Sequence, residues 1–230
     1  MSIKSKAKAI IGVAFNAVIF GGLLFAPAGT LKWWRAWVFL GVVVTASIIT
    51  MATVFQDSEE LLNERFKPPI QSGQPLADRI ILIAFVASFF LLIGFIPLDV
   101  FHWHLLGGPP AIIAALGLAV FLAGWWLIAL ALSANTFAAP VVRHQEERHQ
   151  VVVERGAYRV VRHPMYAGGI LIMAGMPLWL ESWAATLFAI LPITLMAIRI
   201  VFEEQFLRRK LQGYDNYAAH VRYRLIPFVW

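Results

Sequence analysis

Residues 156–169, GAYRVVRHPMYAGG, place arginine, histidine and proline directly before an apolar run that begins at Met165. Gly156 permits a backbone turn that a side chain would hinder. Pro164 suits the first turn of a helix, where its missing N–H is harmless, so His163 lies at the cap beside unpaired backbone donors. Such a helix start suits an anionic or hydrogen-bonding group of a ligand. An interfacial loop whose arginines bind lipid phosphates is the alternative interpretation of this stretch.

A second charged group closes the last apolar run. Arg199 and Glu203 are four residues apart, so they share a helix face and can pair, and Glu204 follows directly. Ionisable residues near the end of a membrane span are either functional or extend to the lipid headgroups. The tail after them, YDNYAAHVRYRLIPFVW, has the aromatic and arginine content of a segment in the membrane interface. It can be an anchor, or a lid over a site formed by the last two spans.

Other chemistries find little support in the sequence. The chain has no cysteine, which excludes disulfides and thiolate chemistry. His102 and His104 are two apart and would not share a helix face, while His144 and His149 stand in a polar loop. With six histidines in all, a metal site is not expected. The motifs GxSxG, GxGxxG and the P-loop are absent.

The elements that position these residues are apolar. Hydrophobic residues make up 60% of the 230, whereas a soluble domain is nearer half. Runs long enough to cross a bilayer occur at approximately 9–26, 35–55, 79–98, 110–132, 164–180 and 182–202. They are too long and continuous for barrel strands, so we predict an all-α integral membrane protein with about six transmembrane helices. The last two should form a hairpin that turns at Glu181 and Ser182, and the first run, with no clear cleavage site after it, should be retained.

Basic residues predict the orientation. They gather in four segments: the N-terminus, 56–79, 133–163 and 203–230. The alternate loops carry only Lys32 and Arg35, so both termini and these segments are predicted to be cytoplasmic. The net charge of +6 fits such loops and anionic lipid, and no nucleic-acid partner is expected. We divide the chain into a four-span membrane region, 1–132, and a candidate catalytic region, 133–230.

The RHPxY motif before the hairpin, the Glu-Glu pair after it and a Tyr…Tyr…Ile-Pro-Phe tail form a combined pattern. With this pattern residues 133–230 resemble the isoprenylcysteine carboxyl methyltransferase family and its relatives among phospholipid N-methyltransferases. The first four spans match only in general hydropathy. The resemblance implies an S-adenosylmethionine-dependent membrane methyltransferase. It also implies that the cofactor binds on the cytosolic side, and that the acceptor is a lipophilic small molecule or a lipidated substrate.

The resemblance also implies roles for single residues. The cofactor-binding positions that it implies are Gln150, Val151, Val152, Val153, Tyr158, His163, Pro164, Met165, Tyr166 and Glu203, with Glu204 as the alternative register. Arg199 matches an arginine implicated in substrate contact, which makes it the expected catalytic and substrate-binding residue. Family members can have histidine at the position of Gln150, and His149 is adjacent, so the register of this strip stays open. Arg143 matches a further cofactor contact loosely.

The chemistry of methyl transfer agrees with these roles. An ammonium and ribose hydroxyls need a carboxylate such as Glu203, and an adenine needs apolar or aromatic walls. A carboxylate acceptor is already nucleophilic, so the protein must align it and exclude water, and Arg199 could orient it by a bidentate contact. An amine acceptor would have to lose a proton, for example to Glu204 or a histidine. We favour carboxyl O-methylation and keep phospholipid or amine N-methylation as the alternative.

Two further interpretations stay open. Membrane sterol reductases resemble this region but bind NADPH, whose 2′-phosphate would need an arginine cluster such as Arg143, Arg148, Arg155 and Arg159. The chain has few spans for that class, and the acids at 203 and 204 would repel phosphates. A non-enzymatic membrane scaffold would leave the combined spacing of the motifs as coincidence. The sequence does not indicate the identity of the acceptor or the oligomeric state.

Overall fold

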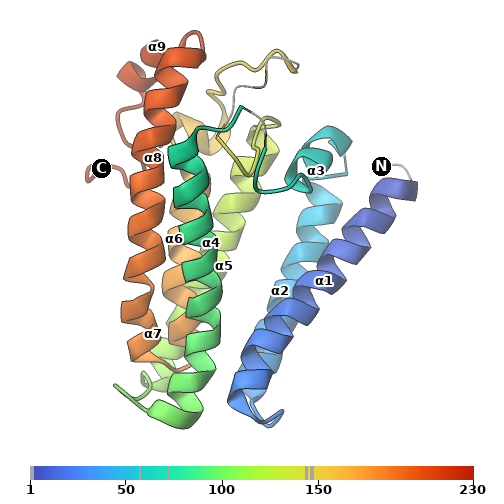
Figure 1. Ribbon diagram of the computed structural model, residues 1–230, viewed down its shortest axis with the longest axis vertical. Helices are drawn as coiled ribbons and strands as arrows, with labels where there is room; N and C mark the ends of the chain where they lie inside the picture. The colour runs from blue at the N-terminus through green and yellow to red at the C-terminus, as the bar shows by residue number, and fades with distance from the viewer. Residues whose placement is uncertain (1–2, 57, 72, 143–144, 146–147) are drawn as a thin grey trace.

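The computed structural model describes the whole chain except residues 1–2, 57, 72, 143–144 and 146–147 (Figure 1). The described part is all-helical, as predicted. Its longer helices are α1 (Ile3–Ala28), α2 (Trp34–Thr53), α4 (Leu76–Leu98), α5 (Ala111–Ala134), α6 (Pro164–Trp179) and α8 (Ile190–Lys210). Its short elements are α3 (Glu59–Arg65), the π-helix η1 (Asp99–Trp103), the 3₁₀-helix η3 (Gly156–Arg159), α7 (Trp183–Phe188) and α9 (Tyr214–His220).

These helices match the six predicted apolar runs. Among the described residues, five helical stretches are long and apolar enough to cross a membrane, and α6, with 16 residues, is shorter, as the run 164–180 predicts. Pro164 is the first residue of α6 and follows His163 at the N-cap, in agreement with the sequence. The predicted turn is also present, because Glu181 adopts a positive φ of 68° and the hydroxyl of Ser182 accepts the Ala185 N–H at 2.8 Å.

The main apolar core lies where α1, α2, α4, α5 and α6 meet. Phe39, Leu92, Ile93, Phe121 and Met176 are almost fully buried there. Many other apolar side chains on the same helices remain exposed, as expected for surfaces that face lipid. The core therefore fixes the helices to one another while leaving a lipid-compatible exterior.

The tightest packing joins α5 to α6, which have the most extensive contact of any helix pair. On α5, Gly117 faces Gly175 of α6, and Gly124 faces Gly168. The two glycines of each helix are seven residues apart, so they lie on the same face of that helix. A Cβ at Gly124 would lie 2.5 Å from the carbonyl oxygen of Gly168. The absence of side chains thus lets the two backbones approach closely. α7 and α8 follow α6 in the chain, as the predicted hairpin requires, but the principal partner of α6 is α5.

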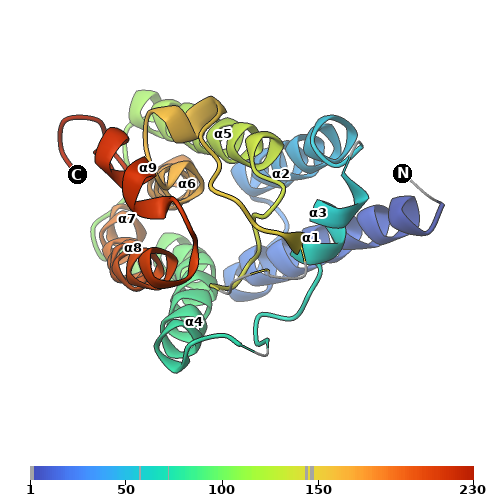
Figure 2. The same ribbon diagram turned by 90° about the horizontal axis from the view of Figure 1, so that it is seen from above.

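One end of the bundle collects the polar segments. α3, α9 and the segment between α5 and α6 lie there, and that segment crosses the end of the bundle when seen from above (Figures 1 and 2). The backbone N–H of Arg162 donates to the carbonyl of Tyr223 at 2.9 Å, and that of His163 donates to Arg224 at 2.9 Å. The loop before α6 and the C-terminal tail therefore meet, as the predicted topology requires. The side of the membrane on which they lie stays a prediction.

The glycine contacts between α5 and α6 give a stability test. We expect Gly124→Ala to lower the free energy of unfolding by about 1–3 kcal/mol, because the new methyl group would force the helices apart. Gly94→Ala on α4 is the matched control, since nothing lies within 4 Å of a Cβ built there. Thermal unfolding in detergent measures the difference. Equal melting temperatures for the two variants would contradict this account of the packing.

Candidate active site

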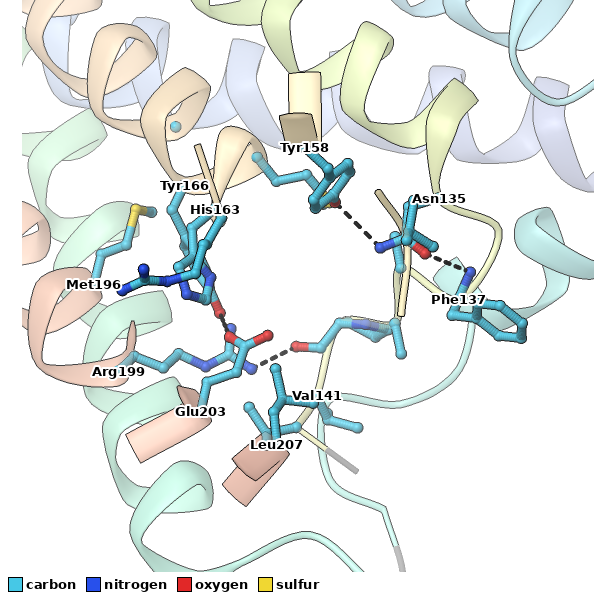
Figure 3. A pocket seen from close by; sticks show the side chains of 18 of the residues that line it. Asn135, Phe137, Val141, Tyr158, His163, Tyr166, Met196, Arg199, Glu203 and Leu207 are labelled. Carbon is cyan, nitrogen blue, oxygen red and sulfur yellow. Dashed lines mark hydrogen bonds between the residues drawn. The ribbon is translucent and has the colours of Figure 1, made fainter. Parts of the chain in front are cut away.

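A cavity of about 500 Å³ lies beneath the segment that joins α5 to α6 (Figure 3). Its polar wall includes Asn135, His163, Tyr166, Arg199 and Glu203. Its apolar wall is built by the spans themselves, with Leu82, Phe85 and Phe89 from α4, Ile172 and Met173 from α6 and Met196 from α8. One cavity thus joins a hydrogen-bonding region to an apolar region at the depth of the helices.

Most of the residues predicted for the site line this cavity. They are Gln150, Val151, Val152, Val153, Tyr158, His163, Met165, Tyr166, Arg199 and Glu203. Pro164 and Glu204 are not part of the lining. Arg143, His144 and two loop glutamates lie outside the described residues. Among the residues that are described, no group of three or more histidines and acids could hold a metal ion.

Tyr166 and Glu203 form the polar contact at the centre of the cavity. The hydroxyl of Tyr166, on α6, donates to Oε2 of Glu203, on α8, at 2.6 Å (Figure 3). Within the described part of the chain, no hydrogen bond or ion pair reaches Oε1 of Glu203. One carboxylate oxygen is thus held in place while the other is available to a cationic or hydroxyl-bearing ligand.

Arg199 is held by α4. We expected it to pair with Glu203, but its Nε lies 2.7 Å from Oδ1 of Asp78, which is 2% exposed. Its Nη2 donates to the carbonyl of Pro140 at 2.9 Å, and Asp78 also accepts the N–H of Val142 at 3.1 Å. Asp78 therefore fixes both the guanidinium and the segment above it. The sequence signal that could have revealed it is an acid in the first turn of an apolar span.

Glu204, in contrast, is buried and paired with basic side chains of the protein. It is 3% exposed, and its Oε1 lies 2.6 Å from Nε of Arg162 and 3.2 Å from Nε2 of His163. Its Oε2 lies 2.9 Å from Nε of Arg224 in the tail. Arg162 also donates to the carbonyl of Val221 at 2.8 Å. The two adjacent acids therefore differ: Glu203 faces the cavity, and Glu204 joins the RHP motif to the tail.

Three tyrosines complete the polar rim. The hydroxyl of Tyr158 accepts from Nδ2 of Asn135 at 3.2 Å, and the hydroxyl of Tyr217 donates to the carbonyl of Tyr158 at 2.8 Å. Burial raises the pKa of Tyr158 to about 12, so its hydroxyl stays protonated at neutral pH. The buried hydroxyl of Tyr214 has no hydrogen-bond partner among the described residues, although Tyr214 lines the cavity. A buried hydroxyl without a partner is a candidate ligand contact, which the sequence did not single out.

Of the four arginines suggested for a nucleotide phosphate, the three that the structure describes lie outside the cavity. Arg148 pairs with Glu60 at 2.5 Å, and Nε of Arg155 donates to the carbonyl of Ala134 at 2.8 Å. Neither of them lines the cavity, and nor does Arg159. Within the described residues, the cluster required for the reductase interpretation is therefore not assembled at this site.

Comparison with known proteins supports the resemblance read from the sequence. The family model described as phospholipid methyltransferase matches residues 112–213, which run from α5 to the end of α8 and beyond. The probable protein-S-isoprenylcysteine O-methyltransferase of Oryza sativa subsp. japonica is 30% identical over 104 residues, 44% of this chain and 53% of the relative. Protein-S-isoprenylcysteine O-methyltransferase B of Arabidopsis thaliana is 31% identical over 103 residues, 44% of this chain and 51% of the relative.

The chain spans about half the length of these curated relatives. Within that span, the predicted resemblance to isoprenylcysteine carboxyl methyltransferases and phospholipid methyltransferases is confirmed. The apolar helices and the similarity to these methyltransferases together support a multi-pass integral membrane protein with a methyltransferase-like region. The part of the cavity wall formed by α4 lies outside the matched residues.

The division between the two acids predicts different mutant phenotypes. Glu204→Gln removes the negative charge that faces Arg162 and Arg224, and breaking a buried pair costs about 3–5 kcal/mol. We expect a lower melting temperature and faster proteolysis of the tail after Leu211. Glu203→Gln is the matched control, and it should melt near the wild type because its contacts with the protein are few. If Glu203→Gln is the less stable variant, the structural role belongs to Glu203 and not to Glu204.

Proposed function

We propose that this protein transfers a methyl group from S-adenosylmethionine to the carboxylate of a lipophilic acceptor at the membrane surface. The observation that carries the proposal is the single cavity whose polar end holds Glu203 and Tyr166 and whose apolar end is walled by membrane helices. A water-soluble cofactor and a lipid-tailed acceptor can meet only in such a place. The names of the relatives, which are isoprenylcysteine O-methyltransferases, support the same chemistry.

The residues present fit this cofactor. Oε1 of Glu203 and the hydroxyl of Tyr214, both without a described partner, suit its ammonium and ribose hydroxyls. The first turn of α6 leaves backbone N–H groups without partners inside the helix, and these suit its carboxylate. Val151–Val153 and Tyr158 offer walls for adenine. When bound, the cofactor supplies a methyl group already activated on a sulfonium.

The protein then has to orient the acceptor and exclude water. Arg199 is suited to hold the acceptor carboxylate, because Asp78 and the carbonyl of Pro140 fix the plane of its guanidinium at the cavity wall. A carboxylate needs no general base, so alignment supplies most of the catalysis. The tail over the loop, held by Glu204, limits the access of water to the polar end. The acceptor tail can extend along Phe85 and Phe89 into the apolar end.

Ligand binding and turnover should separate the two central residues. We expect wild-type protein to bind S-adenosylmethionine saturably by calorimetry and to transfer radiolabelled methyl to a lipid-soluble fraction. Glu203→Ala should weaken cofactor binding, because it removes the free carboxylate oxygen. Arg199→Lys should spare cofactor binding and lower turnover, because lysine keeps the charge beside Asp78 but loses the planar fork.

Absence of saturable cofactor binding by the folded wild type would overturn the proposal. Label in an amine-bearing phospholipid rather than in an alkali-labile ester would instead favour the N-methyltransferase alternative.

We also propose that the site faces the cytoplasm, where the cofactor is available. The natural lack of cysteine allows single-cysteine mapping. Arg209→Cys at the exposed end of α8 should react with an impermeant maleimide only after cells are opened. Leu106→Cys, exposed at the other end of the bundle, should react in intact cells. The opposite pattern would place the site on the outer face.

A further inference from the structure

Arg65 lines the same cavity from a part of the chain that precedes the family match. It is the last residue of α3, whereas the matched region begins at residue 112. Ser58 caps α3 by accepting the N–H of Leu61 at 3.3 Å. Leu61 and Leu62 are almost fully buried against apolar residues of α2 and α5 and of the segment after α5. α3 is therefore firmly anchored, and it holds Arg65 at the cavity wall.

Arg65 and Arg199 differ in the partners that the described residues offer them. The guanidinium of Arg199 pairs with Asp78, but no described residue forms a hydrogen bond or an ion pair with that of Arg65. Burial lowers the pKa of Arg65, and the positive charge of Arg199 is the next cause. Both cations line the same cavity. A partly buried cation without a counterion is costly, so this position is suited to an anion supplied by a ligand.

Each charged residue that lines the cavity can be checked for a partner of opposite charge. The charged residues that line it, within the described part of the chain, are Arg65, Arg162, Arg199 and Glu203, apart from the titratable His163. Arg162 is paired with Glu204 and Arg199 with Asp78. Glu203 keeps one oxygen for the ammonium of the proposed cofactor. Among the described residues, Arg65 is left without a partner of opposite charge.

We propose that Arg65, together with Arg199, binds the carboxylate of the acceptor and so selects an anionic head group. This inference rests on the proposed function. The cofactor as a whole is a cation, because its carboxylate offsets its ammonium and leaves the sulfonium charge, so it does not supply the missing anion. The planar fork of an arginine matches a carboxylate. Tyr166, whose ring lies 5.8 Å from the guanidinium of Arg199 and which lines the same cavity as Arg65, places that carboxylate next to the proposed cofactor position.

The test uses Arg65→Met, which keeps an unbranched apolar stem but not the charge, and Arg65→Lys, which keeps the charge but not the fork. Arg209→Met, at an exposed position outside the cavity, is the matched control. The probes are N-acetyl-S-farnesylcysteine, its carboxamide, S-adenosylmethionine and decarboxylated S-adenosylmethionine. Binding of each probe is measured in detergent, after thermal unfolding has shown that the variants are folded.

We expect the wild type to bind the acid at least about tenfold more tightly than the carboxamide, as a charge-assisted contact predicts. Arg65→Met should lower this preference several-fold while Arg199 remains, Arg65→Lys should restore part of it, and Arg209→Met should leave it unchanged. Affinity for S-adenosylmethionine should stay within about twofold of the wild type in all variants. Loss of a direct contact between Arg65 and the cofactor would instead weaken binding about tenfold.

Other results overturn the inference. Equal wild-type affinity for the acid and the carboxamide excludes an anion site, even if Arg65→Met does not fold. If Arg65→Met weakens the binding of S-adenosylmethionine but not of its decarboxylated form, Arg65 binds the carboxylate of the cofactor instead. Unchanged binding of every probe gives Arg65 no ligand role. If the wild type binds the acid selectively but binds no cofactor, only the proposed methyl transfer is contradicted. The failure of the proposed function can thus be distinguished from the failure of this inference.

Discussion

The buried carboxylate of Glu204 is the interaction on which the site depends most. Its contacts with Arg162, His163 and Arg224 bring together three segments that are distant in the chain, namely the loop before α6, the end of α8 and the tail. Removing a charge from water is expensive unless its partners are well placed, so this cluster tolerates few alternative arrangements. The rigidity that results holds the adjacent Glu203 toward the cavity and keeps the tail over the loop.

Much of this architecture could be predicted from the sequence. Apolar length alone indicated the helices, since a bilayer imposes both the span and the hydrogen bonding of its backbone. Pro164 fixed the start of α6, and Ser182 together with Glu181 the turn that follows it. The contact between loop and tail followed from the distribution of basic residues, although the membrane side itself is not visible in the fold. Local constraints of this kind leave a signature in a single segment.

Contacts between distant segments left no such signature. The partner of Arg199 was expected one helical turn away, at Glu203, but Asp78 lies on another helix and its pairing depends on tertiary packing. The same holds for Tyr214 and Arg65, whose positions at the cavity depend on the folding of α9 and α3. The seven-residue spacing of glycines in α5 and α6 is visible in the sequence, but it does not indicate which helix packs against these glycines. Family likeness also drew attention to residues 112–213, whereas part of the wall comes from earlier in the chain.

This origin of the wall has an evolutionary consequence. The proposed donor contacts lie on α6, α8, α9 and the loop between α5 and α6, while α3 and α4 supply Arg65 and the aromatic lining of the apolar end. Mutations in the two earlier helices could reshape the choice of acceptor while leaving the methyl-donor half untouched. Descendants of one ancestor could in this way diverge toward different lipids, and similarity confined to the later half would be a poor guide to what each of them modifies.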